Sequence, residues 1–156
     1  MWWILMQLNS YFWVSKMENQ TPKTFTIKGY ASVFNVVDHH GDMMIKGAYA
    51  QTLHASKERT RKRPIPLLWH HDPKTPIGSI KTLYEDDHGL YIEGEIVSFP
   101  SPLIPLLEKG IISGLSVGYK LHQSKRTRGV TFITKVELFE VSLVTFPACE
   151  EARIVG

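Results

Sequence analysis

Apolar and polar residues alternate along the chain from about residue 24 onward. The first such stretch has an apolar or small residue at every second position: Phe25, Ile27, Gly29, Ala31 and Val33. A period of two is typical of a β-strand that buries one face. We therefore predict a strand over residues 24–33.

Later segments predict further short strands separated by turn residues. They cover residues 65–69, 77–84, 90–97, 115–121 and 130–145. Residues 85–89 have the composition of a hairpin turn, and a second turn is expected at residues 125–129. The last predicted strand is long for a single strand, so we expect a bend or bulge near Glu137.

Two short helices interrupt the predicted strands. Residues 47–56 carry apolar side chains four residues apart, which favours a helix. Ser101 and Pro102 are typical of a helix start, with the serine as N-cap, and Gly110 is a typical stop. Six or seven strands joined mostly by hairpins predict a mainly β (α+β) fold, an antiparallel barrel or sandwich decorated by short helices.

The N-terminal segment has a different character. The first 16 residues are apolar but interrupted by polar ones, and they are too short to span a bilayer about 30 Å thick. They also lack the early basic residue of a secretory signal, since the first lysine is Lys16, and Met17 offers a second start. We expect residues 1–20 to be an extension outside the fold, without a membrane contact, and residues 21–156 to form a single domain.

Composition narrows the functional classes. The chain has 18 Lys and Arg against 15 Asp and Glu, and its net charge of +3 is less than a dedicated nucleic-acid-binding domain usually carries. The basic runs at 57–63 and 125–128 contain no aromatic residue, so we interpret them as solvated loops. The single cysteine, Cys149, excludes an intramolecular disulfide and favours a reducing compartment. We expect its thiol to be inert, because no histidine is near it in the sequence.

Ser116 is a candidate nucleophile. It lies in Gly114-Leu-Ser-Val-Gly118, and a glycine two residues to either side would let another chain approach the hydroxyl closely. The alternative is a strand serine between two glycines that ease a bend in a barrel. The pattern alone favours this second interpretation, because Gly-x-Ser-x-Gly is weak and does not stand here in the strand-turn-helix context of a nucleophile elbow.

His70 and His71 end an apolar predicted strand and precede Asp72. Histidine is the usual general base for a serine, because its pKa of about 6.5 leaves it mostly neutral at pH 7. Adjacent side chains on a strand point to opposite faces, so at most one of the two can serve Ser116. Alternatively, the pair forms a surface turn in which Asp72 caps its own backbone.

Glu140 stands among apolar residues of the last predicted strand. A carboxylate on a buried face must be paired or hydrogen-bonded, and orienting a histidine would provide that partner. Alternatively, Glu137 and Glu140 both face solvent on a long edge strand. Because they are three residues apart, a regular strand cannot place both on one face.

The histidines and acids lack the spacing of a metal site. His39, His40, His71, Asp72 and His88 would have to converge from separate loops, and the sequence contains no His-Glu-x-x-His or Cys-x-x-Cys pattern. We therefore expect neither a metal nor another cofactor. A metal hydrolase built on the histidine pairs stays an alternative that a chelator would test.

An ordered series of short motifs runs from about residue 25 to residue 155. Its members are Gly29–Asn35, Asp38, Gly41-Asp42, Gly47–Tyr49, Leu68–Asp72, Pro76–Gly78, Gly89-Leu90, Gly114–Gly118 and Glu140–Val144 with Pro147. The series resembles the prohead (procapsid) maturation serine protease family of tailed phages. Each motif is weak alone, whereas the ordered series is specific.

The resemblance implies a fold and a set of catalytic residues. The family is distantly similar to the herpesvirus assembly protease, a helix-decorated antiparallel β-barrel with a His-Ser-His triad. The nucleophile then corresponds to Ser116 and the general base to His71, with His70 in a variable position. The third position falls at or beside Glu140, which departs from the herpesvirus triad, and Asp72 is a poorer candidate for it.

The oxyanion donors are a second departure. The arginine pair that helps to hold the oxyanion in the herpesvirus enzyme has no counterpart near residues 145–151. Backbone N–H groups near residues 114–117, or in a loop that the sequence does not reveal, are then the expected donors.

The resemblance also implies the activity and its setting. The chain would be a serine endopeptidase that cleaves scaffold protein, the scaffolding region of the major capsid protein, and itself. It would act inside the prohead, in the cytoplasm of the bacterial host. Its partners would be these protein substrates, and we expect no specific nucleic acid and no membrane. Both a monomer and a homo-oligomer are compatible with the sequence. The alternative is a non-catalytic capsid-assembly or scaffold-binding module on the same barrel.

Overall fold

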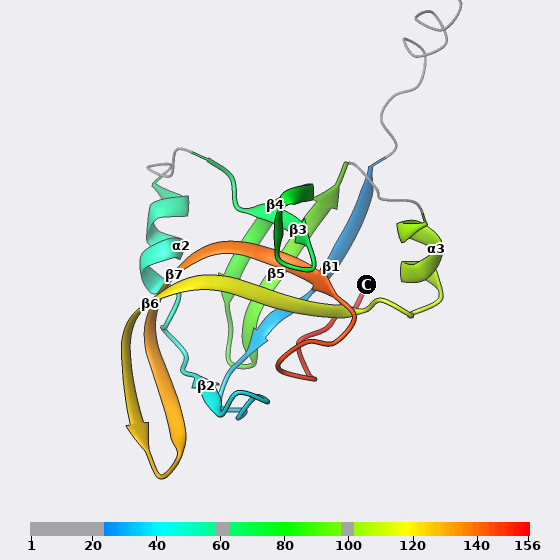
Figure 1. Ribbon diagram of the computed structural model, residues 1–156. Coiled ribbons are helices and arrows are strands. Elements are labelled where there is room, and N and C mark those ends of the chain that lie inside the picture. The colour runs from blue at the N-terminus through cyan, green and yellow to red at the C-terminus, as the bar shows by residue number, and fades with distance from the viewer. Residues whose placement is uncertain (1–23, 59–62, 98–101) are drawn as a thin grey trace, which may run out of the picture.

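A curled β-sheet is the main feature of the computed structural model, which describes residues 24–58, 63–97 and 102–156 (Figure 1). Its strands are β1 (Phe25–Val33), β2 (Asp42–Met44), β3 (Pro66–Trp69), β4 (Asp72–Glu85), β5 (Gly89–Ile96), β6 (Gly114–Thr127) and β7 (Val130–Val144). In the described part of the chain, two short helices accompany them, α2 (Ala50–Lys57) and α3 (Leu103–Glu108). The predicted mainly β fold with short helices is confirmed.

Strand β7 joins the two halves of the sheet. The strand order is β1-β5-β4-β3-β7-β2, and β6 also pairs with β7. Residues 131–133 of β7 pair with β2 and residues 141–143 pair with β3, both in parallel, whereas β6 runs antiparallel along nearly the whole strand. The pairs β1–β5, β5–β4 and β4–β3 are antiparallel as well, so the sheet is mainly antiparallel, as expected.

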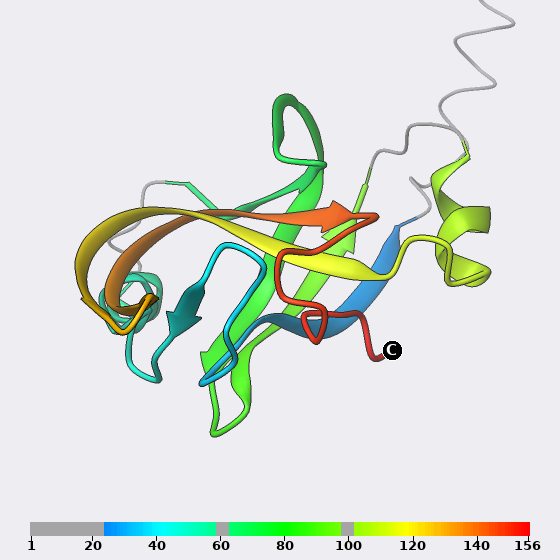
Figure 2. The ribbon, with the colours of Figure 1, turned by 60° about the horizontal axis from the view of Figure 1, so that its bottom comes forward.

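A C-terminal segment closes the gap between β1 and β6. Leu115 N–H donates a hydrogen bond to the Ala152 carbonyl (2.8 Å), and Tyr30 N–H donates one to the Arg153 carbonyl (3.1 Å). The approach is close, because a Cβ at Gly29 would lie 2.2 Å from that Arg153 oxygen. Figure 2 shows this segment, in red, beside β1 in blue. The barrel-like sheet is therefore completed by an irregular segment rather than by another strand.

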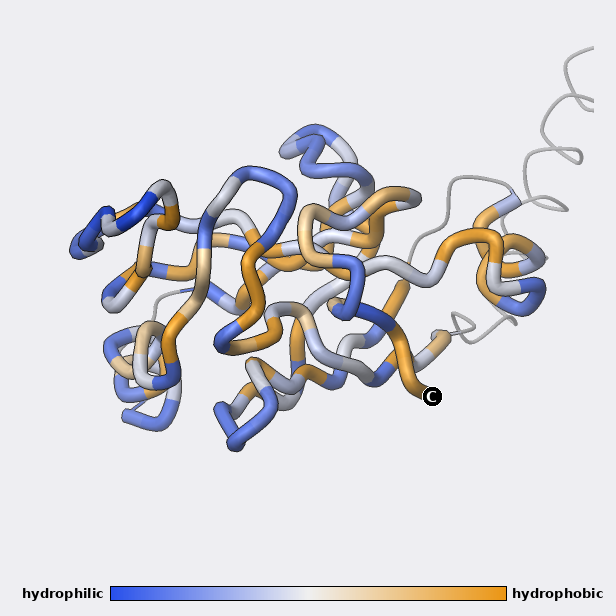
Figure 3. Tube along the Cα trace, turned by 90° about the horizontal axis from the view of Figure 1, so that it is seen from below, coloured by the Kyte–Doolittle hydropathy of each residue, from blue (hydrophilic) through white to orange (hydrophobic). Residues whose placement is uncertain are grey.

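The core fills the inside of the curled sheet. The alternation predicted for the first strand is observed, since Ile27 and Ala31 are buried while Thr26 and Lys28 are exposed. The largest fully buried side chains on the strands are Ile27, Leu67, Ile77, Leu90, Ile92, Ile96, Leu115, Ile133, Leu138 and Leu143. Hydrophilic residues gather at the tips of the hairpins, most strongly at the β6–β7 tip (Figure 3).

Both helices begin differently from the prediction. Helix α2 starts three residues later than residue 47, because Glu85 accepts hydrogen bonds from the N–H groups of Gly47 and Tyr49 and holds these residues in turns. In α3, Pro102 occupies the N-cap position that the sequence assigned to Ser101. Ser101 itself lies outside the described residues.

Three strands also differ from the prediction. Strand β6 continues to Thr127 rather than ending at residue 121, because residues 123–127 pair with β7, so the turn expected at residues 125–129 is confined to residues 128–129. Strand β2 is three residues long, too short to produce a periodic signal in the sequence. Strand β4 begins at Asp72 rather than at residue 77 and contains Pro73 and Pro76. This first part of β4 pairs only with β3, so a proline that lacks an N–H leaves no ladder bond unmade on the other edge.

The N-terminal extension predicted for residues 1–20 lies outside the described residues, and its separation from the domain stays a prediction. The basic run at 57–63 is described only at its two ends. Within the described ranges, neither helix is long and apolar enough to cross a lipid bilayer.

Candidate active site

Strands β6 and β7 place Ser116 and Glu140 on the same side of the sheet. Ser116 is paired with Ser142, and Gly118 is paired with Glu140. Paired residues on neighbouring strands share a side, as do residues two apart on one strand. Leu115, which has the opposite phase, is fully buried in the core. The side chains of Ser116 and Glu140 therefore lie on the side of the sheet away from the core.

A β-bulge at Phe139 brings Glu140 to this side. After the pair between Gly118 and Glu140, the next pair is Tyr119 with Leu138, so Phe139 has no partner in β6. The extra residue reverses the alternation of inward and outward side chains along β7. The bulge that we expected in this part of the last strand is confirmed.

The bulge also puts Glu137 and Glu140 on one side of β7, so the opposite orientation expected for a regular strand is wrong here. Their surroundings differ. The side chain of Glu140 is 12% exposed, whereas that of Glu137 is 44% exposed and lies with its Oε2 3.5 Å from His122 Nε2. Burial, rather than the side of the sheet, distinguishes the two acids.

The two glycines around Ser116 make room for β7. A Cβ at Gly118 would lie 2.1 Å from Glu140 Oε1, and a Cβ at Gly114 would lie 2.6 Å from the Val144 carbonyl oxygen. Real Cβ atoms essentially never come this close to another atom. Gly118 is therefore required by the buried carboxylate, and neither access to the hydroxyl nor a bend in a barrel explains it as directly.

His70 and His71 form the two-residue turn between β3 and β4. Trp69 pairs with Asp72, and the two histidines have φ of +48° and +61°. Positive φ at both central residues is typical of a tight hairpin turn, but residues other than glycine or asparagine adopt it at a cost on the order of 1–3 kcal/mol. The histidines are therefore not the end of a strand, and the alternative of a turn is confirmed.

Hydrogen bonds hold this strained turn in place. The backbone N–H of His70 donates to a β7 carbonyl (3.0 Å), and that of His71 donates to Ser142 Oγ (3.1 Å). The Asp72 carboxylate accepts a hydrogen bond from the backbone of residue 74 (2.9 Å) and one from the hydroxyl of residue 75 (2.6 Å). These bonds lower the pKa of Asp72 and assign its carboxylate to shaping the turn.

His71, Glu140 and Ser142 form a chain of hydrogen bonds. His71 Nδ1–H donates to Glu140 Oε1 (2.6 Å), and Ser142 Oγ–H donates to Glu140 Oε2 (2.6 Å). The bond to the carboxylate raises the pKa of His71 above its ordinary value, while partial burial opposes this effect. A neutral imidazole that carries its proton on Nδ1 leaves Nε2 as an acceptor, which is the state that a general base requires.

Ser116 and His71 line one cavity of about 380 Å³. Tyr119 and Phe146 contribute aromatic rings to its wall, and Phe146 is 92% exposed. Other lining residues include Asp38, His40, Asp42, Ala148 and Cys149. A molecule bound in this cavity can therefore contact both the candidate nucleophile and the candidate base.

Two parts of this site were missed by the sequence analysis. Ser142 received no role, although its position two residues after Glu140 places both side chains on one side of a strand. Phe146 was not considered either, because nothing in the sequence around it distinguishes an exposed aromatic residue at a cavity from one in the core.

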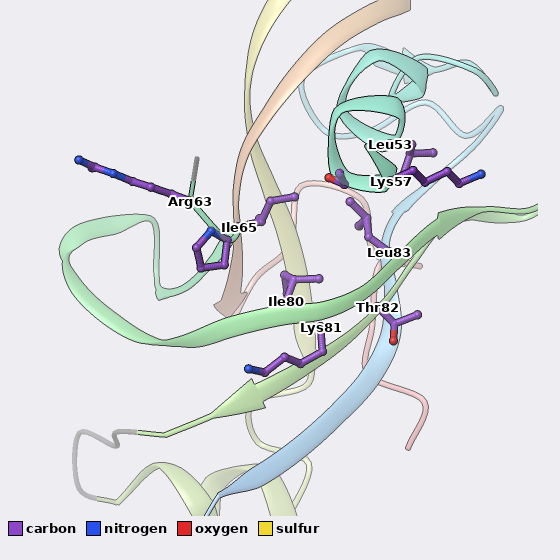
Figure 4. Close-up of a pocket in the computed structure, with 10 residues that line it drawn as sticks. Leu53, Lys57, Arg63, Ile65, Ile80, Lys81, Thr82 and Leu83 are labelled. Atoms are coloured by element: carbon purple, nitrogen blue, oxygen red, sulfur yellow. The ribbon is translucent and has the colours of Figure 1, made fainter. Parts of the chain in front are cut away.

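A larger cavity, of about 490 Å³, lies elsewhere in the fold (Figure 4). Leu53, Ile80 and Leu83 give it an apolar surface, with Lys57 and Lys81 beside them. Among the described residues that line it, none is a histidine or an acid. Because the described residues of the larger cavity offer neither a histidine nor an acid to pair with a serine, the smaller cavity is the candidate active site.

His39 and His88, which were weighed as metal ligands, have separate neighbours. His39 Nε2 lies 3.4 Å from Glu150 Oε1, and the His88 ring packs edge-on against Tyr30 with 4.4 Å between the ring centres. In the part of the chain that the structure describes, no three His, Cys, Asp or Glu side chains are grouped so that they could hold a metal ion.

A serine and a carboxylate-bonded histidine that share one cavity are the arrangement on which serine hydrolases rely. The sequence as a whole gives the more particular assignment. The chain belongs to the caudovirus prohead serine protease family, whose model matches residues 12–155. The family resemblance carried by the ordered motifs is confirmed.

Individual relatives agree with this assignment. The chain is 34% identical over 136 residues to the prohead protease of Enterobacteria phage HK97, with 83% of this chain and 58% of that protein covered. It is 30% identical over 129 residues to the prohead protease of Escherichia phage T5, covering 81% and 60%. It is also 32% identical over 107 residues to the capsid polyprotein of Pseudomonas phage PAJU2, covering 61% and 16%. The chain therefore spans less than two thirds of the length of these relatives.

Solved structures support the fold. The bacteriophage T4 capsid assembly protease superposes with a TM-score of 0.60 at 16% identity, covering 78% of this chain and 82% of that one. The protease of KSHV, in complex with a hexapeptide phosphonate inhibitor, gives a TM-score of 0.53 at 15% identity, covering 85% and 64%. The herpesvirus-protease-like fold expected from the sequence is confirmed.

Proposed function

We propose that this chain is a serine endopeptidase of phage capsid maturation, with Ser116 as nucleophile, His71 as general base and Glu140 as the acid that orients the imidazole. Family membership supports the activity. The observation that carries the assignment of the residues is the 2.6 Å bond between His71 Nδ1 and Glu140 Oε1, together with the cavity that His71 and Ser116 both line.

The proposed reaction follows from the residue types. Ser116 Oγ attacks the scissile carbonyl while His71 Nε2 takes the hydroxyl proton. The same proton then goes to the leaving amine as the C–N bond breaks, which leaves an acyl-enzyme. A water molecule, deprotonated in turn by His71, hydrolyses this ester and restores Ser116. Throughout, Glu140 accepts the Nδ1–H bond and stabilises the imidazolium that forms.

One of the backbone N–H groups expected near residues 114–117 as oxyanion donors is already hydrogen-bonded within the fold. Leu115 N–H already donates to the Ala152 carbonyl (2.8 Å), so it is not free to bind a developing oxyanion. Successive backbone N–H groups alternate between the two edges of a strand, so the N–H of Val117, on the same edge as that of Leu115, is the neighbouring donor that fits the proposal. A well-placed donor of this kind typically contributes a factor of about 10²–10³ in kcat.

The proposed substrates are scaffold protein and the scaffolding region of the major capsid protein, cleaved inside the prohead in the bacterial cytoplasm, together with cleavage of the chain itself. The names of the relatives, two prohead proteases and a capsid polyprotein, support protein substrates of the capsid. The cavity offers both aromatic and acidic walls to a peptide side chain.

Two variants test the function. Ser116→Ala should abolish cleavage of the cognate capsid protein on a gel and abolish labelling by a fluorophosphonate probe, with little change in Tm because one hydroxyl is lost. Ser124→Ala, an exposed serine on the same strand, is the matched control and should cleave and label like the wild type.

Two results would overturn the proposal. Cleavage by Ser116→Ala at the wild-type rate would move the nucleophile to another residue. A wild type that binds capsid or scaffold protein but neither cleaves it nor reacts with the probe would instead favour the non-catalytic assembly module.

A further inference from the structure

Ser142 contacts two residues of the candidate active site, His71 and Glu140, although it does not line the cavity. Its side chain is fully buried, and it faces Ser116 across the β6–β7 pair. Its hydroxyl makes two hydrogen bonds. It accepts one from the backbone N–H of His71 (3.1 Å) and donates one to Glu140 Oε2 (2.6 Å).

We propose that Ser142 is a positioning residue, whose single hydroxyl fixes both the turn that carries His71 and the carboxylate that orients its ring. This role rests on the proposed function, because it matters only if His71 acts as a base. Ser142 touches neither substrate nor nucleophile in the proposal. It acts through the other two residues.

The carboxylate needs this hydroxyl because it is buried. Glu140 has one oxygen bonded to His71 and the other bonded to Ser142. A buried carboxylate that loses a donor is destabilised, because no hydrogen bond offsets its desolvation at that oxygen. It also becomes freer to rotate. With the hydroxyl removed, Oε1 is no longer held opposite Nδ1, and the bond that raises the His71 pKa weakens.

The turn needs the hydroxyl for a different reason. His70 and His71 are both in the left-handed region, a conformation that persists only where surrounding contacts enforce it. The N–H bond to Ser142 is one of those contacts, and it acts on the residue whose ring must face Ser116. One hydroxyl thus holds the backbone and the ring of the same histidine.

A second buried hydroxyl provides a matched control. Thr52 on α2 is buried, and its Oγ1 accepts a hydrogen bond from Leu138 N–H on β7 (3.0 Å). It therefore bonds to the same strand as Ser142 but to no ionisable side chain. Removing either hydroxyl leaves one backbone N–H unsatisfied, and only Ser142 is also bonded to the His71–Glu140 pair.

Several ionisable groups surround His71, and a titration of its ring has to take their charges into account. The groups that line the same cavity, lie in the turn or adjoin it are His70 in the turn itself, Glu140 on β7, Tyr119 on β6, Asp42 on β2, Asp38 and His40 in the loop before β2, Asp72 on β4 and Cys149 after β7. Among them, Glu140 is the group that raises the pKa of His71. A fall in this pKa after a change at Ser142 therefore reports on the Glu140 bond.

The test compares Ser142→Ala, Ser142→Cys and Thr52→Val in the full chain by NMR titration of the His71 ring and by kcat and KM on the cognate capsid protein. We expect Ser142→Ala to shift the His71 pKa down toward its ordinary value and to lower kcat by about 10²-fold, the usual effect of a misplaced catalytic group, with KM changed less than about 3-fold. Ser142→Cys, a weaker donor of similar volume, should give intermediate values. Thr52→Val should lower Tm without moving the His71 pKa.

The two measurements separate this inference from the function on which it rests. An unchanged His71 pKa in Ser142→Ala, or an equal loss of kcat in Thr52→Val, would overturn the positioning role. If Ser142→Ala does not fold, Ser142→Cys decides, and a wild-type pKa there overturns the role as well. If the wild type cleaves nothing but Ser142→Ala still shifts the His71 pKa, Ser142 positions the His71–Glu140 pair although the proposed function is wrong.

Discussion

Two histidine–glutamate pairs lie along β7, and their difference shows what holds such a pair together beyond the residue types. His71 Nδ1 lies 2.6 Å from Glu140 Oε1, whereas His122 Nε2 lies 3.5 Å from Glu137 Oε2. Both glutamates are on the same side of the strand because of the bulge between them. The same two kinds of side chain therefore meet twice, once tightly and once loosely.

The environment of the acid accounts for the difference. Glu140 fills the space left open by Gly118 and receives a second hydrogen bond from Ser142. Glu137 lies opposite Lys120, whose side chain leaves no such space, and it is nearly half exposed. An exposed pair of this type contributes little to either stability or orientation, because water competes for both partners.

The largest expected effect distinguishes the two glutamates directly. Glu140→Gln should keep the fold but lower kcat strongly, because an amide can present a donor to Nδ1 and favour the wrong tautomer. The equivalent acid-to-amide change in a Ser-His-Asp protease costs about 10⁴-fold. The measurement is kcat/KM on the cognate capsid protein, with Tm recorded in parallel.

The exposed pair, His122 and Glu137, supplies the controls for this prediction. Glu137→Gln and His122→Ala should leave kcat/KM within about 2-fold of wild type, since surface changes of this kind usually have small effects. Near-wild-type activity for Glu140→Gln, together with a large loss for His122→Ala or Asp72→Asn, would transfer the third role to that residue.

A smaller effect is expected when the space for the buried acid is filled. In Gly118→Ala the new Cβ would meet Glu140 Oε1 at 2.1 Å, so the carboxylate must leave its position. We expect about a 10²-fold loss of kcat, with a loss of stability on the order of 1–3 kcal/mol measured by urea denaturation. Gly94→Ala is the control, because a Cβ there meets only side-chain atoms at 3.4–3.5 Å. Equal activity of the two variants would contradict the role of Gly118.

The smallest effect is in the pH dependence. Glu140 raises the pKa of His71 above about 6.5, and the proposed reaction needs the neutral ring, so the acid limb of kcat/KM should have its midpoint above pH 6.5. The protonated ring is favoured in the folded state, so its contribution to stability is full below about pH 6.5 and is lost as pH rises through the folded pKa.

A pH profile from 5 to 9 tests this expectation. Glu140→Gln should move the acid limb to lower pH, and His122→Ala should leave it in place. A wild-type midpoint at or below the ordinary histidine value would show that the short Nδ1 bond does not persist in solution.

The fold was largely predictable because strands that bury one face have apolar residues at every second position in the sequence. The alternation in β1 and the turn composition at residues 85–89 both correspond to observed elements. The length of the last strand predicted its bulge. Strand β2 was not predictable, because three residues carry no period, and its position depends on a parallel pairing with β7 that is distant in sequence.

The site was predictable in its residue types but not in its geometry. Ser116, His71 and Glu140 were proposed from their surroundings and from family motifs, and their catalytic roles stay predictions. The turn at His70 and His71 was foreseen only as an alternative, because left-handed histidines are uncommon and are enforced here by contacts with β7. The role of Ser142 depends on that turn folding back over the strand.

The bulge at Phe139 divides β7 into two segments of opposite phase. The Phe139 side chain is half-exposed and pairs with no residue of β6, so its chemical identity matters little to the core. Its departure from the regular pairing is what matters. In a regular strand of the same sequence Phe139 would take the place opposite Gly118, every side chain on one flank would change sides relative to the other, and Glu140 would enter the core while Val141 turned outward. The site therefore depends on the place where the strand leaves its regular pairing, and substitutions of Phe139 that keep the bulge are compatible with it.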